Sequence, residues 1–482
     1  MIAGTSGSND GDVSGNHGGG DLWVLKLSPQ GSTVWQRCYG GSNIESGGSI
    51  QETPDGGFVI QGSTTSDDGD VVGYHSGAGT WDCWIFKINS SGILQWSRAL
   101  GGSGHDVGSR LIQTADDGFL ANLEYTESND GDVTNYNGNG DCWLVKLSAS
   151  GGIEWSRTVG GSQGESGTDI LELSNGDLML LGITSSSDGD ISLNRGGSDV
   201  LLAKISSSGQ LLWERTYGGT LGDGCFSILP TTDGGFVMAG HSRSSDGDAS
   251  SNAGEQDAWV LKVDANGSLL WQRSFGGSLN DRVFLCAADS GGYLLSGTTY
   301  SNDGSVQGNN GESDLWFLKL TDNGELAWQH CLGGSAEDGG SLQARTSDGG
   351  YVAFGFTESN DGDVSGNHGQ QDTWVVKLLV TEPAEPIAPL ECALFIPTAF
   401  SPNSSGKNDA QCLYGTDCIT SMNFGIFNRW GNKVFESTNP NVCWDGTYNG
   451  QALDPAVFVY HLSATLTGGE TVERKGNITL VR

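Results

Sequence analysis

The sequence predicts an all-β protein, and three observations support this prediction. Short segments in which apolar and polar residues alternate recur along the chain, as half-buried strands do. The turns between them, such as SPQGS, NSSGI and DANGS, have tight-turn chemistry. The segments also recur at a regular spacing, and each unit holds four short strands and no helix. Together these features predict a repeat protein built from small sheets.

The repeat is most visible in a DG dipeptide whose first acid recurs seven times. Its spacings are 58, 62, 58, 58, 57 and 58 residues, and the acids are Asp10, Asp68, Asp130, Asp188, Asp246, Asp303 and Asp361. The surrounding stretch SNDGDVSGNHG occurs identically at residues 8–18 and 359–369. Each loop precedes a segment such as DLWVLKL, a Trp segment, Gly-Gly with an acid four residues later, and a strand such as GGFVIQG. Each repeat therefore supplies strands of four fixed types.

Four-stranded units repeated six or seven times predict a β-propeller, in which radial closure protects the sheet edges. A parallel β-helix is the alternative, but its coils are usually shorter than these repeats. The four strand types occur six, six, seven and seven times, two strands short of seven complete blades. We therefore expect residues 1–379 to form a seven-bladed ring whose first blade is incomplete, lacking two strands. Met1 would be an internal residue or a mispredicted start of a longer secreted precursor, and closure would bring the two copies of SNDGDVSGNHG side by side.

Composition limits the classes of partner. The 482 residues include 58 Asp and Glu against 23 Lys and Arg, a formal net charge of −35. Nucleic acids and anionic membranes need a positive protein surface, so neither is an expected partner. No run of 18 apolar residues is present, so no membrane-spanning segment is predicted. The first residues lack the basic and apolar regions of a signal peptide. The charge fits a solvated extracellular surface or a protein that binds cations.

The DG loops have the oxygen spacing of a twelve-residue calcium loop. In the first loop, acids or hydroxyls occupy positions 1, 3 and 5, glycine position 6 and an acid position 12, and such oxygens wrap Ca²⁺. The spacing between the acids at positions 1 and 12 recurs in six of the seven loops. The candidate ligands are Asp10, Asp12, Ser14 and Asp21; Asp130, Asp132 and Asp141; Asp188, Asp190 and Asp199; Asp246, Asp248 and Asp257; and Asp361, Asp363, Ser365 and Asp372. The loop from Asp68 to Asp82 is longer, and Ser305 replaces the second acid of the sixth loop. Calcium is therefore a candidate cofactor, while Asx-turns or capping of backbone amides between blades would explain the same acids without a metal.

The sequence contains no convincing catalytic motif. No HExxH, GxSxG, phosphate-binding or dinucleotide-binding motif stands in a suitable context. Repeat-symmetric acids usually serve structure, so residues that break the repeat are better candidates for ligand contacts, among them Arg195, Arg243, Arg282 and Tyr300. The Trp residues at fixed places in the repeat are expected to pack blade against blade.

A second composition begins after a linker at residues 380–391, VTEPAEPIAPLE, which contains Pro and Glu. Residues 392–482 alternate as five or six strands, which predicts a small Ig-like β-sandwich. They carry PTAFSPN, ND, FNRWG, VF, WDG, NG and a terminal GNITLVR, in this order. On these motifs, the segment resembles the gliding-motility-associated C-terminal domain of Bacteroidetes, the type B sorting domain of type IX secretion substrates. Ser404-Ser405 stands where that family usually has Gly-Asp, and Ala456 replaces a common Gly.

The resemblance implies export through the outer membrane by the type IX machinery, followed by release or attachment at the cell surface. Cys392, Cys412, Cys418 and Cys443 fit an oxidising compartment. Of their three possible connectivities we expect Cys392–Cys412 and Cys418–Cys443. Most of the six cysteines in the repeats are expected to be small buried residues.

These inferences lead to one leading functional hypothesis and two alternatives. The leading hypothesis is a secreted, non-catalytic propeller that displays a binding or adhesive face at the cell surface, for a glycan or another surface protein. The first alternative is a polysaccharide-degrading enzyme with its site in the central channel, and the second is a structural surface or filament component. Because propellers host many functions, the fold does not choose among them. A cluster of repeat-breaking acids, His or Tyr at one mouth of the channel would favour the enzyme.

Overall fold

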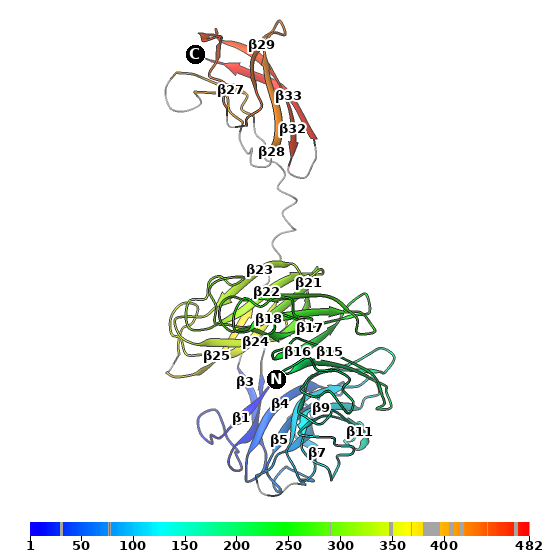
Figure 1. Ribbon diagram of the computed structural model, residues 1–482. Helices are drawn as coiled ribbons and strands as arrows, with labels where there is room; N and C mark the ends of the chain where they lie inside the picture. The colour runs from blue at the N-terminus through cyan, green and yellow to red at the C-terminus, as the bar shows by residue number, and fades with distance from the viewer. Residues whose placement is uncertain are drawn as a thin grey trace. The chain divides into compact units, whose positions relative to one another are not determined.

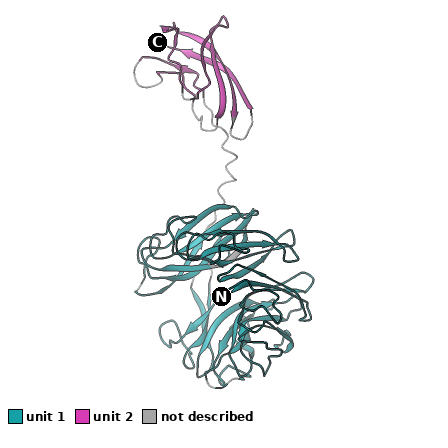
Figure 2. Cartoon of the chain, in the orientation of Figure 1, with its two compact units in different colours: residues 1–379 teal, residues 380–482 magenta. Residues whose placement is uncertain are grey.

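The computed structural model describes residues 1–28, 32–75, 77, 79–289, 291–346, 350–367, 369–378, 396–403, 409–413, 419–440, 442–466 and 471–481. It divides the chain into two units, Met1–Leu379 and Val380–Arg482 (Figure 2). The predicted linker at residues 380–391 lies outside the described residues. Within the described ranges, no helix is long and apolar enough to cross a membrane.

Unit 1 consists of seven antiparallel sheets, five of four strands and two of three (Figure 1). The inner strands are β4 (Glu45–Glu52), β8 (Asp106–Gln113), β12 (Glu165–Glu172), β16 (Asp223–Pro230), β20 (Asp281–Asp289) and β24 (Asp338–Arg345). The second strands are β1 (Ile2–Ser6), β5 (Phe58–Thr64), β9 (Phe119–Thr126), β13 (Leu178–Thr184), β17 (Phe236–Ser242), β21 (Gly292–Thr299) and β25 (Tyr351–Thr357).

The third strands are β2 (Asp21–Leu27), β6 (Asp82–Ile88), β10 (Asp141–Leu147), β14 (Asp199–Ile205), β18 (Asp257–Val263), β22 (Asp314–Thr321) and β26 (Asp372–Leu378). The outer strands are β3 (Thr33–Tyr39), β7 (Leu94–Leu100), β11 (Ile153–Val159), β15 (Leu211–Tyr217), β19 (Leu269–Phe275) and β23 (Leu326–Leu332). We call the first set inner because its consecutive members contact one another from sheet to sheet. The seven successive sheets confirm the predicted propeller architecture.

The expectation that both missing strands belong to the first blade was wrong. The first sheet, β1–β2–β3, is incomplete as expected, but it lacks one strand, the inner one, rather than two. Among the described residues, the last sheet consists of β24, β25 and β26 and has no outer strand. The reason is the pairing within a repeat. Each Trp strand pairs with the strand before it, as β7 does with β6, whereas the strand after the Gly-Gly turn begins the next sheet. The boundary between sheets therefore falls at Gly-Gly.

The sheets pack face to face, and the second and third strands of the five four-stranded sheets are the most buried. One core cluster joins Ala239 and Val260 of one sheet to Val283, Leu295 and other residues of the next. The Trp strands contribute to the same contacts, as expected from the sequence. A Cβ atom placed on Gly151 would lie 3.0 Å from the Trp96 ring of the preceding sheet. The glycine in the turn thus lets the indole lie flat against the neighbouring backbone.

Unit 2 contains a five-stranded sheet and a two-stranded hairpin. The sheet has the order β27 (Ala399–Phe400), β33 (Thr471–Leu480), β32 (Ala456–Leu466), β28 (Ile419–Phe427) and β29 (Lys433–Ser437). The hairpin joins β30 (Thr447–Tyr448) to β31 (Gln451–Ala452). Trp444 is 2 % exposed and packs on Phe458 and Phe400, with ring centroids 4.9 and 5.3 Å away.

The disulfide of unit 2 differs from the expected pairing. Cys412 is bonded to Cys443, whereas Cys392 and Cys418 lie outside the described residues. The physical reason is an antiparallel β-bridge between the backbones of the two residues that are next to these cysteines in the chain. The backbones of Gln411 and Trp444 exchange two hydrogen bonds of 2.8 and 2.9 Å, which brings the neighbouring cysteines together.

Candidate functional site

The first acid of the DG motif holds the turn through which the chain crosses between sheets. At the first junction the Ser42 amide donates a 2.7 Å hydrogen bond to Asp68 Oδ1. The equivalent bonds, between 2.7 and 2.8 Å, join Ser103 to Asp130, Ser162 to Asp188, Thr220 to Asp246, Ser278 to Asp303 and Ser335 to Asp361. All six crossing turns are therefore held by a loop acid of the following sheet.

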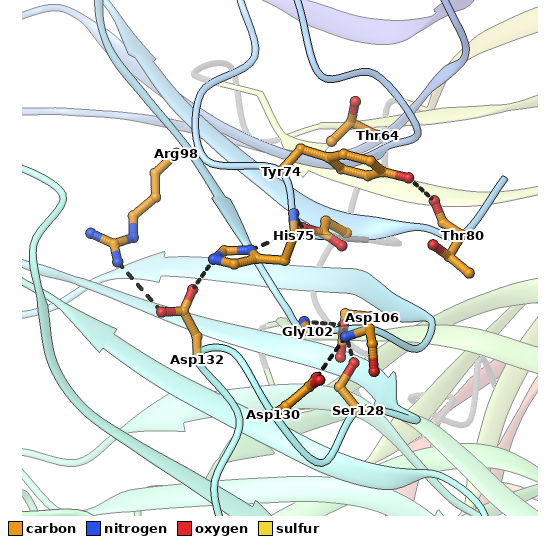
Figure 3. Close-up of polar contacts among 12 residues, drawn as sticks. Thr64, Tyr74, His75, Thr80, Arg98, Gly102, Asp106, Ser128, Asp130 and Asp132 are labelled. Carbon is orange, nitrogen blue, oxygen red and sulfur yellow. Dashed lines mark hydrogen bonds and ion pairs between the residues drawn. The ribbon is translucent and has the colours of Figure 1, made fainter. Parts of the chain in front are cut away.

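The acid that opens each inner strand lies at the centre of the junction (Figure 3). Asp106 is fully buried and accepts hydrogen bonds from Thr126 Oγ1, from Ser128 Oγ at 2.6 Å and from the Gly102 amide at 2.8 Å. Burial raises the pKa of Asp106 to about 6, against the lowering effect of these hydrogen bonds. A Cβ atom at Gly101 would lie 2.5 Å from Asp106 Oδ2 and 3.0 Å from Asp82 Oδ1. Two carboxylates thus occupy the space of that side chain, which is why the repeat requires glycine here.

Five of the acids that open third strands carry a buried oxygen without a hydrogen-bond partner among the described residues. Asp141 Oδ2 accepts the Asn137 amide at 2.9 Å, but its buried Oδ1 has no hydrogen-bond partner. Burial, and then the charges of Glu165 and Asp190, raise the pKa of Asp141 to about 7. The same oxygen is buried and unpaired in Asp21, Asp199, Asp257 and Asp314. Each of these junctions therefore holds two or three acids that disfavour one another's charge.

The candidate calcium ligands of one loop do not converge on one point, because they interact with different neighbouring sheets. In the loop from Asp188 to Asp199, the first acid holds the turn of the preceding junction. In addition to burial, the charge of Asp190, the acid at position 3, raises the pKa of Asp141 in the preceding sheet. In the same way, the charges of Asp223 and Asp248 in the following sheet add to the effect of burial and raise the pKa of Asp199. Ser14 in the first loop accepts a 2.5 Å hydrogen bond from Gln36. Over the described ranges, no three Asp, Glu, His or Cys side chains are placed together to hold a metal ion.

Some junctions contain a cation that breaks the repeat. His75 lies between two acids, with Nδ1 3.1 Å from Asp82 Oδ2 and Nε2 3.6 Å from Asp132 Oδ2 (Figure 3). Arg98 approaches the other oxygen of Asp132 at 3.6 Å. Arg195, named above as a candidate for ligand contacts, instead pairs with Asp248 at 3.1 Å. Arg98 and Arg195 thus offset part of the acid surplus of their junctions, and His75 places its ring nitrogens beside two acids.

Two of these junctions open into surface cavities. One has a volume of about 430 Å³ and is lined by residues that include His75, Trp96 and Arg98. The other, of about 450 Å³, lies at the preceding junction and includes His17 and Arg37. The two cavities lie at equivalent positions of successive repeats, so they arise from the repeated architecture.

A different cluster lies where the inner strands of the fifth and sixth sheets meet. The Phe226 ring on β16 is 5.5 Å from the Phe284 ring on β20 and 5.3 Å from the His241 ring on β17. The guanidinium of Arg282 lies 5.1 Å from the centre of the Phe284 ring. Both phenylalanines are extra residues at register shifts of their strands, where the other inner strands have Gly48, Ser109 and Thr168. The cluster therefore departs from the repeat.

The electrostatics of this cluster are unlike those of the junctions. Burial, and then the charges of Arg243 and Arg282, lower the pKa of His241 to about 4. His241 Nδ1 is buried and has no hydrogen-bond partner. Among the described residues neither arginine takes part in an ion pair, although the chain is strongly acidic. The cluster combines aromatic faces with two unpaired positive charges.

Sequence reasoning singled out Arg243 and Arg282 but missed Phe226, His241 and Phe284. The available signal was the aromatic residue in place of a small one at the same position of successive repeats. Tyr300 does not belong to the cluster, and its amide bonds the Asn280 carbonyl at a junction.

Comparison with known proteins identifies the C-terminal unit. Residues 394–480 match the CHU_C Type IX secretion signal domain. This unit is a type IX secretion signal domain. The protein is therefore exported, to be secreted or attached at the outer surface. The match agrees with the resemblance seen in the motifs of this segment.

Similarities of the remaining chain are more distant. The regulatory protein FlaEY of Caulobacter vibrioides is 28 % identical over 190 residues, which is 36 % of this chain and 20 % of FlaEY. The chain thus spans a fifth of that relative. A mutant of Synechocystis apocarotenoid oxygenase is 14 % identical, with a TM-score of 0.38 over 67 % of this chain and 72 % of the oxygenase. A puromycin hydrolase mutant is 12 % identical, with a TM-score of 0.42 over 95 % of this chain and 54 % of the hydrolase.

Proposed function

We propose that unit 1 is an exported binding module for a glycan or a surface protein, and that its ligand is held by Phe226, His241, Arg282 and Phe284. The single observation that carries this proposal is the aromatic and cationic cluster at the inner strands. The repeated acids are engaged between sheets, whereas this cluster breaks the repeat and leaves its charges unpaired.

The chemistry of the cluster favours a ligand with flat apolar faces and negative charge. Aromatic rings stack against the apolar faces of ligands, and Arg guanidinium groups bind carboxylates with paired hydrogen bonds. Two cations without acidic partners in a chain of net charge −35 disfavour each other. An anionic group placed between them removes that repulsion. Among cell-surface glycans, those carrying acidic sugars fit best.

Binding to immobilised polysaccharides tests the proposal. The purified chain should bind acidic glycans more tightly than neutral ones, and added salt should weaken the binding. Arg282→Gln should weaken binding roughly tenfold or more, since a charged hydrogen bond contributes about 1.5–3 kcal/mol. Arg273→Gln is the matched control, because Arg273 stacks on Trp271 of an outer strand at 5.8 Å. Equal loss in both variants, or none in either, would contradict this site.

The alternative function, a polysaccharide-degrading enzyme, uses the same cluster. Its supporting observation is His241, whose lowered pKa keeps the imidazole in its neutral form near pH 7. Release of new reducing ends from a bound polysaccharide, abolished in His241→Gln, would favour the enzyme. Tight binding without product over long incubation would favour the binding module.

A further inference from the structure

A cavity of about 340 Å³ lies between the third and fourth sheets, away from the acidic junctions. Its walls include Trp155 of the outer strand β11 and Leu178, the first residue of the second strand β13. Glu172, the last residue of the inner strand β12, also lines the cavity. Because β12 begins at the junction acid Glu165, the cavity lies at the opposite end of the strands from the Gly-Gly turn.

The cavity occurs where the repeat loses an aromatic ring. Each of the five other sheets that have an inner strand carries a buried aromatic residue at the position of Leu178, namely Phe58, Phe119, Phe236, Tyr293 and Tyr351. The ring of Phe119, for example, packs against Trp96 of the preceding sheet, with the ring centroids 5.9 Å apart. Leu178 is smaller than these residues, and the space beside Trp155 stays open.

The aromatic wall of the cavity is held in place before any ligand arrives. Trp155 Nε1 donates a 3.2 Å hydrogen bond to the Ser207 carbonyl, and a Cβ atom at Gly209 would lie 2.9 Å from the indole ring. The turn of the fourth sheet therefore fixes the indole from one side. A ring that enters the cavity meets a positioned aromatic surface, and the volume lies at the lower end of the range for small-ligand pockets.

Acids outnumber bases around the cavity. Lys146 lines it, and Nζ of this residue lies 3.0 Å from Asp116 and 3.5 Å from Glu154. The Lys146 side chain is only 9 % exposed, so its charge is already matched by these acids. Glu172 adds a further carboxylate, whose Oε2 accepts a 2.8 Å hydrogen bond from the Ala115 amide. The surplus of negative charge favours a ligand that carries a positive group.

We propose that this cavity binds a small organic cation that carries an apolar ring. The ring takes the place that Phe or Tyr fills in the other sheets, against Trp155 and Leu178. The cationic group lies beside the carboxylate of Glu172, where it completes the charge balance of the cavity. A cation close to an indole gains further from the negative face of that ring, and the preformed walls limit the entropy lost on binding.

Benzylamine, a cation at neutral pH, is the probe for calorimetric titration of the full chain. Benzyl alcohol and benzoate have the same ring with a neutral and a negative group, so they separate the effect of charge from that of the ring. We expect a single saturable site for benzylamine, with affinity roughly tenfold or more above that for either control, since hydrogen bonds to charged groups contribute about 1.5–3 kcal/mol.

Two variants locate the site. Leu178→Phe restores the ring found in the other sheets, so it should abolish binding and keep or raise the melting temperature of unit 1. Glu172→Gln keeps an oxygen for the Ala115 amide but removes the charge, so it should weaken benzylamine binding roughly tenfold. Glu52→Gln is the matched control, because Glu52 ends β4 at the equivalent position, where Phe58 fills the space. It should leave binding unchanged.

Several outcomes would overturn the proposal. They are no binding of benzylamine, equal affinity for benzoate or benzyl alcohol, and undiminished binding to the Leu178→Phe variant. Equal loss of affinity in Glu172→Gln and Glu52→Gln would also contradict it, and this comparison decides the matter if Leu178→Phe fails to fold. The cluster proposed to bind a glycan lies on other sheets, so either proposal can fail alone.

Discussion

Asp257 and Asp281 direct two buried carboxylates at one glycine. A Cβ atom at Gly276 would lie 2.5 Å from Asp257 Oδ1 and 2.8 Å from Asp281 Oδ2. Asp281 is hydrogen-bonded by Ser301 at 2.7 Å, whereas Oδ1 of Asp257 has no partner. Two acids from neighbouring sheets thus meet at each such glycine, and they repel each other when both are charged.

This arrangement predicts stability that rises when the pH is lowered from 8.5 to 6.5. Burial raises the pKa of Asp141 to about 7 and of Asp199, Asp257 and Asp314 to about 6, above the value of about 3.9 expected in the unfolded chain. The folded state therefore binds more protons in this window, so stability falls as the pH rises through these values. Thermal melts across the range test this, and a flat profile would contradict it.

Asp257→Asn should raise the melting temperature at pH 8. The amide removes one charge of the pair, keeps an oxygen for the Ala253 amide, and can donate to Asp281. The matched control is Asp264→Asn, since Asp264 lies in an exposed turn where backbone hydrogen bonds lower its pKa. That control should leave stability unchanged or lower it. A loss of stability in Asp257→Asn would mean that the charge of Asp257 has a partner such as a cation.

Asp188→Ala should lower the stability of unit 1, because it leaves the Ser162 amide without its acceptor. Asp10→Ala is the matched control, since Asp10 is the same residue of the repeat and no crossing turn among the described residues donates to it. It should change stability by less than about 0.5 kcal/mol. Denaturant melts of the two variants decide the point, and equal effects would show that the loop acids act within their own loops.

Calcium remains a separate prediction of the loop spacing. If Ca²⁺ binds the loops, a chelator should lower the melting temperature by several degrees, and elemental analysis should find the metal in the purified protein. The expected sites are the junctions, where a cation would satisfy the unpaired oxygens of Asp141 and Asp314. An unchanged melt together with absence of metal would end the hypothesis.

Loss of the Cys412–Cys443 bridge should destabilise unit 2 and leave the melt of unit 1 unchanged. The bridge closes a separation of 31 residues, for which about 2–4 kcal/mol is typical. Cys412→Ser and Cys443→Ser should have equal effects. Peptide mapping without reductant should recover residues 412 and 443 in one fragment, and any other pairing would contradict the structure.

The sequence carries local information well and non-local information poorly. Each repeat contains its own turn signals, such as Asp55-Gly-Gly before Phe58, so strand types and number could be predicted. The boundary between sheets could not, because it depends on whether the strand after Gly-Gly pairs backward or forward.

The same limit explains the misses at the sites. The position of Phe226 as an extra residue depends on the register between β16 and β17, which spacing does not reveal. The partner of Cys412 depends on the bridge between Gln411 and Trp444, residues far apart in the chain. The spacing of the sequence identifies the DG acids as a set. It does not reveal that their hydrogen-bond donors are the amides of the crossing turns that lead into their sheets.

Amide hydrogen exchange across the seven DG loops tests the central claim most directly, namely that six junctions are locked by loop acids, whereas no crossing turn among the described residues donates to Asp10. The account predicts slow exchange at the crossing-turn amides of Ser103, Ser162 and Ser278, and fast exchange over residues 8–14. Protection of residues 8–14 equal to that of the loops around Asp130 and Asp188 would contradict it.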